Sequence, residues 1–368
     1  MKKVSVIIPV YNGEKYIEQT IKNILQSTYS NLELIIVNDG SMDSSLSICE
    51  KLKESDSRIL IYTKKNEGVA VARNYGLTKV TGDYICFCDQ DDIVEPKTYE
   101  NQVKSIEETQ SDFCMCSTGR NIDGKKSDFE ISQNQCYAEN QILEELLYPL
   151  LFSGFQVPIK MSHTKRYPHI WSCMFKSDFI RKYNVKFRSY INFEDDLLFK
   201  VDVLSKASKV ATISYIGYYW RVNLKSETYH HEYIENIKEK QQKCYEDMFS
   251  CISDRISDTN IQHLFTQVTF CKQYLEAVHN LTSPCFKKTY KFINGYYRDV
   301  IYERNFTDCI SAKKYIKKGQ VKLGILLPLI SKKRTYISYY TEIVLERILL
   351  ITLHSQTLTK MERFLKRS

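Results

Sequence analysis

The order of the first hundred residues constrains this chain most, because short apolar runs alternate there with amphipathic stretches. Each apolar run has the length and composition of a β-strand, and each amphipathic stretch repeats its apolar residues at helical spacing. Such alternation is typical of an α/β fold, with a mostly parallel sheet flanked by helices. We expect strands at residues 4–9, 33–37, 58–62 and 84–88, and helices at residues 14–27, 44–54 and 69–79.

Polar residues follow each predicted strand at the point where it ends. Parallel sheets bind ligands beyond the carboxyl ends of their strands, so these residues are the candidates for a binding site. Each group taken singly is also an ordinary turn or helix cap. Their coincidence at successive strand ends predicts one polar, ligand-binding edge. The groups are Pro9-Val10-Tyr11-Asn12, Asn38-Asp39-Gly40-Ser41, Asn66-Glu67-Gly68 and Asp89-Gln90-Asp91-Asp92.

The last of these groups holds three carboxylates, which would repel one another if all were ionised close together. A divalent cation such as Mn²⁺ or Mg²⁺ relieves that repulsion, and it also neutralises a diphosphate as it becomes a leaving group. A solvated acidic turn ahead of the helix near Pro96 explains the same residues. Both explanations stay open on these residues alone.

Two further clusters carry groups suited to chemistry. Arg73 lies among small residues in the third predicted helix, where its forked cation suits a phosphate as well as a surface ion pair. Glu194, Asp195 and Asp196 precede another predicted helix, and one of them could accept the proton of an attacking hydroxyl. Acids at a helix start are also ordinary stabilisers, and that is their commoner role.

Together these segments resemble family 2 glycosyltransferases with the GT-A fold. The resemblance covers residues 3–225 and includes the later Trp171, Glu194-Asp195 and Tyr218-Tyr219-Trp220-Arg221. It implies an inverting enzyme that moves a sugar from a nucleotide diphosphate sugar, by family habit a UDP-sugar, to an acceptor hydroxyl. The expected setting is the synthesis of capsule, O-antigen or another bacterial surface polysaccharide. The ordered motifs are VSVIIPVYN at 4–12, IIVNDGS at 35–41, NEG at 66–68 with ARNYG at 72–76, and YICFCDQDD at 84–92.

The resemblance also assigns roles at the nucleotide. Asp39 would contact the base, Asp89 the ribose, and Asp91 the metal ion in a DXD motif, with Asp92 in support. Arg73 would lie near the diphosphate. The complete set of nucleotide-sugar ligands implied is Pro9, Tyr11, Asn12, Asp39, Arg73, Asp89, Gln90 and Arg221.

On the acceptor side, the resemblance makes Asp195 the general base, with Glu194 and Asp196 beside it. Because two aspartates are adjacent, the assignment carries an ambiguity of one residue between Asp195 and Asp196. Trp171 could stack on an acceptor sugar, and a buried core tryptophan is an equal alternative.

The chain divides in sequence near residue 228. Residues 1–228 are expected to form the catalytic domain, with a nucleotide-binding part at 1–97 and an acceptor part at 98–228. Residues 229–368 are expected to form a mainly helical region. The chain has a net charge of +8, and its basic surplus lies in residues 313–367. That basic stretch suits either an anionic membrane surface that carries a lipid-linked glycan acceptor or a solvated helical face.

Other functional classes fit less well. A sugar nucleotidyltransferase would need a glycine-rich basic loop near the amino terminus, and Tyr11-Asn12-Gly13-Glu14 is not one. A nucleic-acid binder would carry its basic surplus on a recognition element, which this sequence lacks. The 12 cysteines are scattered without a Cys-x-x-Cys pair, which favours reduced buried thiols. With no apolar run of about eighteen residues, we expect a cytoplasmic protein, either free or peripheral at the inner face of the cell membrane.

Overall fold

The computed structural model describes residues 1–153, 155–162, 168–190, 195–222 and 234–280. The chain divides into two compact units, and the candidate site residues fall in the first. The first unit comprises Met1–Leu151, Lys160–Leu224 and Glu246–Arg255, and the second comprises Phe152–Ile159, Lys225–Tyr245 and Ile256–Ser368.

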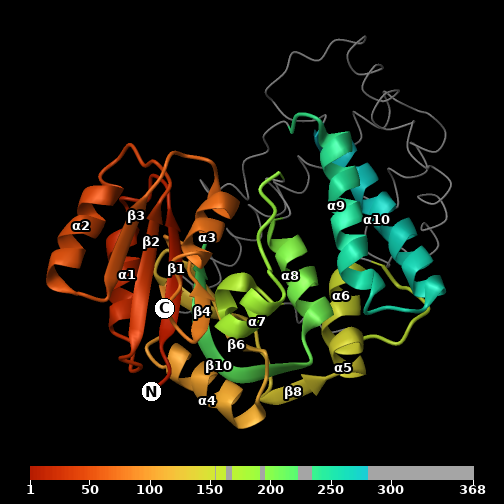
Figure 1. The fold of residues 1–368 in the computed structure, drawn as a ribbon, viewed down its shortest axis with the longest axis horizontal. Helices are drawn as coiled ribbons and strands as arrows, with labels where there is room; N and C mark the ends of the chain where they lie inside the picture. The colour runs from red at the N-terminus through yellow and green to blue at the C-terminus, as the bar shows by residue number, and fades with distance from the viewer. Residues whose placement is uncertain (154, 163–167, 191–194, 223–233, 281–368) are drawn as a thin grey trace, which may run out of the picture. The chain divides into compact units, whose positions relative to one another are not determined.

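In the first unit, the described strands form one sheet in the order β3-β2-β1-β4-β9-β6-β10-β5, with β7 on β6 and β8 on β10 (Figure 1). The predicted parallel arrangement holds for β1 to β4. β9 then pairs antiparallel with both β4 and β6, whereas β6 and β10 are parallel. The strands are β1 (Val4–Val10), β2 (Leu32–Asn38), β3 (Ile59–Thr63), β4 (Tyr84–Phe87), β5 (Ile93–Val94), β6 (Phe113–Ile122), β7 (Lys125–Glu130), β8 (Gln135–Ala138), β9 (Cys173–Lys176) and β10 (Lys209–Arg221).

Helices flank this sheet, as the alternating pattern predicts. The helices of the first unit are α1 (Ile17–Leu25), α2 (Ser45–Ser55), α3 (Val69–Leu77), α4 (Thr98–Thr109), α5 (Asn140–Ile142), a π-helical turn (Leu143–Leu147), α6 (Tyr148–Leu151), a 3₁₀ turn (Ile170–Ser172), α7 (Ser177–Lys182) and α8 (Asp195–Lys206). The α/β fold with a central sheet is therefore confirmed.

Alternate residues of the strands face two separate layers, because side chains of a strand point to opposite faces in turn. Val6 and Ile8 of β1 belong to a buried cluster that includes residues of α1, α2 and α4. Ile7 points the other way, and a Cβ at Gly76 of α3 would lie 2.5 Å from its Cγ2 atom. Phe199 of α8 stacks edge-on against strand phenylalanines on the sheet. Buried thiols fill the cluster at Cys86, Cys88, Cys114 and Cys116, as predicted.

The segment between residues 118 and 135 forms a β-hairpin, although its residues are mostly polar. β6 continues to Ile122 and turns back into β7. Asp123 and Gly124 make the turn with φ values of 49° and 82°. An Asp-Gly pair with positive φ is a tight hairpin turn. Because most of β7 is exposed, it lacks the alternation of apolar residues by which strands are recognised in sequence.

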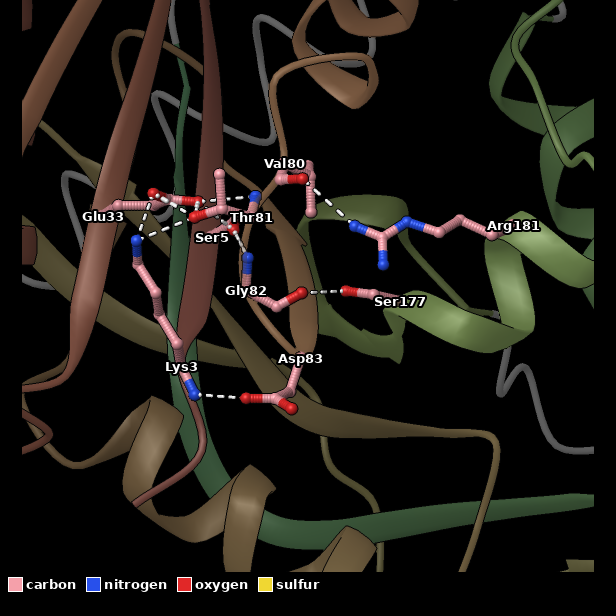
Figure 2. Close-up of polar contacts among 9 residues, drawn as sticks. All are labelled: Lys3, Ser5, Glu33, Val80, Thr81, Gly82, Asp83, Ser177 and Arg181. Carbon is pink, nitrogen blue, oxygen red and sulfur yellow. Dashed lines mark hydrogen bonds and ion pairs between the residues drawn. The ribbon is translucent and has the colours of Figure 1, made fainter.

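A polar network ties the strands together near their amino ends (Figure 2). Glu33 of β2 accepts hydrogen bonds from the Ser5 hydroxyl at 2.5 Å and from the Thr81 backbone N–H at 2.9 Å, and it pairs with Lys3 Nζ at 2.6 Å. Burial raises the pKa of Glu33, but these partners outweigh it and hold the pKa below its ordinary value. The network fixes β1, β2 and the turn before β4 relative to one another.

In the second unit, the described helical residues belong to the first part of α9 (Ile237–Ser253) and to α10 (Thr259–Asn280). Gln241 and Gln273 bond each other's backbone carbonyl oxygens at 3.1 and 2.6 Å. The Tyr245 and Phe265 rings stack with centroids 6.0 Å apart. The basic stretch at 313–367 lies outside the described residues, and the domain boundary at 228 stays a prediction. Among the helices that can be described, none is both long enough and apolar enough to cross a bilayer.

Candidate functional site

The turn from Asp89 to Asp92, between β4 and β5, is held from the side of β1 and α1. Tyr11 donates its backbone N–H to Gln90 Oε1 at 2.9 Å, and Gln90 Nε2 donates to the Tyr11 carbonyl at 3.0 Å. The Thr20 hydroxyl of α1 lies 3.0 Å from the Gln90 carbonyl. Gln90, expected to contact the nucleotide sugar, therefore uses its amide group to fix the loop after β1.

β10 holds the same turn from the other side. The Tyr218 hydroxyl donates to Asp92 Oδ2 at 2.7 Å, and the Arg221 backbone N–H donates to Asp92 Oδ1 at 2.8 Å. Arg221 Nε donates to the Asp91 carbonyl oxygen at 2.6 Å. Asp92 is 1% exposed, and burial with the nearby Asp89 and Asp91 charges raises its pKa well above the usual value. Asp92 thus supports the turn, and its expected part in holding a metal ion beside Asp91 stays a prediction.

Tyr218 is a site residue that the sequence analysis did not single out. Its hydroxyl also accepts the Asp89 backbone N–H at 3.2 Å. The available signal was its position in the motif Tyr218-Tyr219-Trp220-Arg221, three residues before the arginine that contacts the turn.

Asp89 and Asp91 have the chemistry that a divalent cation requires. Burial and the neighbouring Asp89 charge raise the pKa of Asp91 to about 6. A cation would relieve this cost, because hard divalent ions prefer carboxylate oxygens. Among the described residues, no group of three Asp, Glu, His or Cys side chains forms a ready-made metal cage. The donor set therefore fits an ion of the Mg²⁺ or Mn²⁺ type that takes most of its ligands from phosphate and water.

Arg73 joins carboxylates from two distant segments. Its Nη2 atom lies 2.9 Å from Asp89 Oδ1, and its Nη1 atom lies 2.9 Å from Asp196 Oδ1. The side chain is 6% exposed and packs over the Phe187 ring, 5.2 Å from its centroid. The helix start at Asp196 and the turn after β4 are thereby brought together. Arg73, expected near the diphosphate, spans both of them.

Asp39 is engaged at the start of α3. Its Oδ1 atom lies 2.7 Å from Lys64 Nζ and accepts the Glu67 backbone N–H at 3.2 Å, while Oδ2 accepts the Gly68 N–H at 2.8 Å. A carboxylate at a helix amino end is stabilised by the helix dipole. Asp39 therefore anchors the helix that carries Arg73, and a contact with a nucleotide base would add to these bonds.

The loops after β1 and β2 interlock. Asn12, with φ of 48°, accepts the Met42 N–H at 2.9 Å and donates its own N–H to Ser41 Oγ at 3.1 Å. Pro9 is buried within β1. The Tyr11 side chain is 40% exposed beside this interlock, so its ring is open to a ligand.

Of the predicted general-base residues, only Asp196 can be placed with its contacts. Glu194 lies outside the described residues, as does the side chain of Asp195, whose backbone begins α8. Trp171 stacks on both His169 and Tyr218, with ring centroids 4.5 and 4.4 Å away. An acceptor sugar that stacked on Trp171 would have to displace one of these rings.

Residues 5–169 match the model of the family described as Glycosyl transferase family 2. Glycosyltransferase EpsJ of Bacillus subtilis is 28% identical over 228 residues, which cover 61% of this chain and 62% of EpsJ. Minor teichoic acid biosynthesis protein GgaB of the same species is 41% identical over 112 residues, 30% of this chain and 12% of GgaB. The chain thus spans less than two thirds of the length of either relative.

Among solved structures, the chain is similar to residues 1–349 of TarS from S. aureus, crystallised with UDP-GlcNAc. The TM-score is 0.62 at 17% identity, covering 94% of this chain and 91% of the TarS chain. This similarity concerns the fold, and it confirms the GT-A arrangement that the sequence resemblance implies.

Proposed function

We propose that this chain is a glycosyltransferase that moves a sugar from a UDP-sugar to a glycan hydroxyl with inversion. The match of residues 5–169 to glycosyltransferase family 2 supports the proposal. The observation that carries the proposal is the pair of ion pairs made by Arg73, to Asp89 and to Asp196. They join the residues expected to hold the nucleotide to the helix start expected to supply the base.

The donor side is built from the turn after β4 and the loop after β1. The exposed Tyr11 ring would cover the nucleoside, with Asp39 and Asn12 beside it and Asp89 toward the ribose. UDP-GlcNAc bound to TarS, which shares the fold, supports a uridine donor. A Mn²⁺ or Mg²⁺ ion held by Asp91 and Asp89 would neutralise the departing diphosphate.

The acceptor side is expected to use Asp195 as general base. Asp196 is paired with Arg73 at 2.9 Å, which makes it a positioning group and leaves proton abstraction to its neighbour. Asp195 removes the acceptor proton while the oxygen attacks the anomeric carbon from the face opposite the diphosphate. A single displacement of this kind inverts the configuration of that carbon.

The acceptor is proposed to belong to a bacterial surface polysaccharide. The sequence resemblance and the similarity to a teichoic acid biosynthesis protein support this setting. A lipid-linked acceptor would lie at the cytoplasmic face of the membrane, where the basic stretch at 313–367 could dock on anionic lipids.

A screen of nucleotide sugars tests the function. We expect one UDP-sugar to raise the melting temperature and to be slowly hydrolysed when Mn²⁺ is present. Asp91→Ala should lose both effects, while Asp178→Asn should keep them, because the Asp178 side chain is 100% exposed. Failure of every nucleotide sugar to stabilise the wild-type protein or to be hydrolysed would contradict the proposal.

A further inference from the structure

A small pocket lies in the first unit, beside His169, which stacks on Trp171. It is formed by β6, the residues at the end of β7, and the segment that begins at His169. The cavity has a volume of ≈ 20 Å³. That is enough for one water molecule or one hydroxyl group of a ligand, because about 10–15 Å³ suffices for a water.

Thr118 leaves an unsatisfied hydroxyl in the wall of this pocket. The residue is 2% exposed, and among the residues that the structure describes its Oγ1 atom has no hydrogen-bond partner. Nearly all buried hydroxyls in proteins are hydrogen-bonded, so an exception that lines a cavity points to something bound there.

Glu130 and His169 supply the polar side of the same pocket. His169 Nε2 lies 3.1 Å from Glu130 Oε2, and the two side chains are 25% and 21% exposed. Stacking on Trp171 at 4.5 Å holds the imidazole in place. Cys116 and Ile131 make the wall partly apolar.

The chemistry of this lining favours a neutral hydroxyl. A carboxylate accepts a hydrogen bond from a hydroxyl, and the Thr118 hydroxyl can either donate or accept one. None of the residues that line the pocket is lysine or arginine. A phosphate or carboxylate would therefore meet the Glu130 charge without a strong cation to compensate it.

The pocket lies close to the candidate active site. Thr118 of β6 is the register partner of Tyr218 of β10, and the Tyr218 hydroxyl bonds Asp92 at 2.7 Å. Trp171 stacks on Tyr218 and on His169 of the pocket. Stacked rings thus connect the pocket to the turn that is expected to hold the donor.

We propose that this pocket is an acceptor subsite that receives a hydroxyl or hydroxymethyl group of a neutral sugar, bound by Thr118 Oγ1 and the Glu130 carboxylate. The subsite rests on the proposed transferase function, because it uses the acceptor side of that same site. It selects neutral glycans and disfavours acceptors that present a phosphate at this point.

Nuclear magnetic resonance of histidine tests the proposal without requiring transfer. The full chain is labelled in its histidine rings, and the His169 signals are assigned with a His169→Gln variant. Methyl glycosides of glucose, galactose and N-acetylglucosamine are the neutral probes, and glycerol 3-phosphate is the anionic probe. We expect at least one glycoside to shift the His169 signals saturably, and glycerol 3-phosphate to shift them only at higher concentration.

Matched variants locate the hydrogen bond. Thr118→Val keeps the shape but removes the hydroxyl, and it should weaken glycoside binding by about five- to tenfold, the worth of one hydrogen bond. Thr118→Ser keeps the hydroxyl and should bind like the wild type. Glu130→Gln should weaken the glycoside and lessen the exclusion of glycerol 3-phosphate. Thermal unfolding checks that each variant is folded.

The outcomes separate this proposal from the proposed function. If no glycoside shifts the His169 signals, the pocket holds water only and the proposal is overturned. Equal binding by Thr118→Val, or preferential binding of glycerol 3-phosphate, overturns it as well. Loss of metal-dependent donor hydrolysis across all nucleotide sugars in the wild type contradicts the transferase function instead, and it leaves the glycoside titration unaffected.

Discussion

Arg73 Nη1 lies 2.9 Å from Asp196 Oδ1 and so connects α3 to the start of α8, across 123 residues of sequence. The same guanidinium reaches Asp89 with its other nitrogen. Only a planar fork can serve two carboxylates in this way, which distinguishes arginine from lysine here.

Arg73→Lys should therefore lower kcat on the order of 100-fold, the scale of losing one preorganised donor at an active site. The ammonium group can hold one carboxylate but not both at these positions. Steady-state kinetics with the donor found in the screen measures the effect. Arg181→Lys is the matched control, because Arg181 is 56% exposed. Equal kinetics in wild type and Arg73→Lys would remove Arg73 from the site.

Substitutions of Asp91 and Asp92 should have different effects, with activity lost in one case and stability in the other. Asp91→Asn should abolish metal-dependent transfer, while the free energy of unfolding stays the same or rises, because a costly buried charge is removed. Asp92→Asn should destabilise the fold by about 1–3 kcal/mol, because its amide has one acceptor oxygen where Asp92 uses two, for the Tyr218 hydroxyl and the Arg221 N–H. Urea unfolding and activity assays on both variants measure the difference. Removal of the metal with EDTA should reproduce the Asp91→Asn effect on activity. A strong loss of stability in Asp91→Asn would contradict this division.

Gln90→Glu tests the contact with the loop after β1. Glutamate has nearly the same shape, but it loses the amide donor and faces the Tyr11 carbonyl with a negative charge. We expect the donor KM to rise by about tenfold, the worth of one such hydrogen bond with repulsion added. Gln110→Glu is a matched exposed control. An unchanged donor KM would show that the contact does not position the nucleotide.

Glu33 should make stability depend on pH. Its pKa in the folded protein is below the ordinary value of 4.5 because its hydrogen bonds outweigh burial. The resulting stabilisation is complete above the unfolded pKa and is lost as the pH falls through the folded pKa. Glu33→Gln should therefore lose about 1–3 kcal/mol near neutral pH and lose less on acidification below 4.5. Urea titrations across this pH range measure the stability of the wild type and of Glu33→Gln, with Asp178→Asn as the control. Parallel pH profiles for wild type and Glu33→Gln would contradict the role of the carboxylate.

The basic stretch at 313–367 should bind anionic membranes. Replacing Lys332, Lys333 and Arg334 with glutamine should weaken binding to phosphatidylserine vesicles by tenfold or more, because each basic residue near such a surface contributes about 1 kcal/mol. Vesicle sedimentation at several salt concentrations measures this. Replacement of the exposed Lys51 and Lys53 of α2 is the control. Equal vesicle binding by both variants would contradict docking.

Sequence patterns located the parallel core and the polar edge because strand period and turn residues are local properties. Asp39, Asp89 and Asp91 could be placed after the strand ends for that reason. Their partners could not, since the pairing of Arg73 with Asp196 depends on how α3 and α8 pack on the sheet. The exposed β7 was not predicted for a different reason, because its residues do not alternate between apolar and polar. Without β7, neither the position of Glu130 nor the pocket that it forms with His169 could be predicted.

The two hydrogen bonds between Gln90 and the backbone of Tyr11 couple the loop after β1 to the carboxylate turn. Under the proposed function, a nucleoside bound at the Tyr11 ring would act through the Gln90 amide group on the position of the turn proposed to hold the metal. Donor binding and the arrangement of the metal ligands would then be directly coupled.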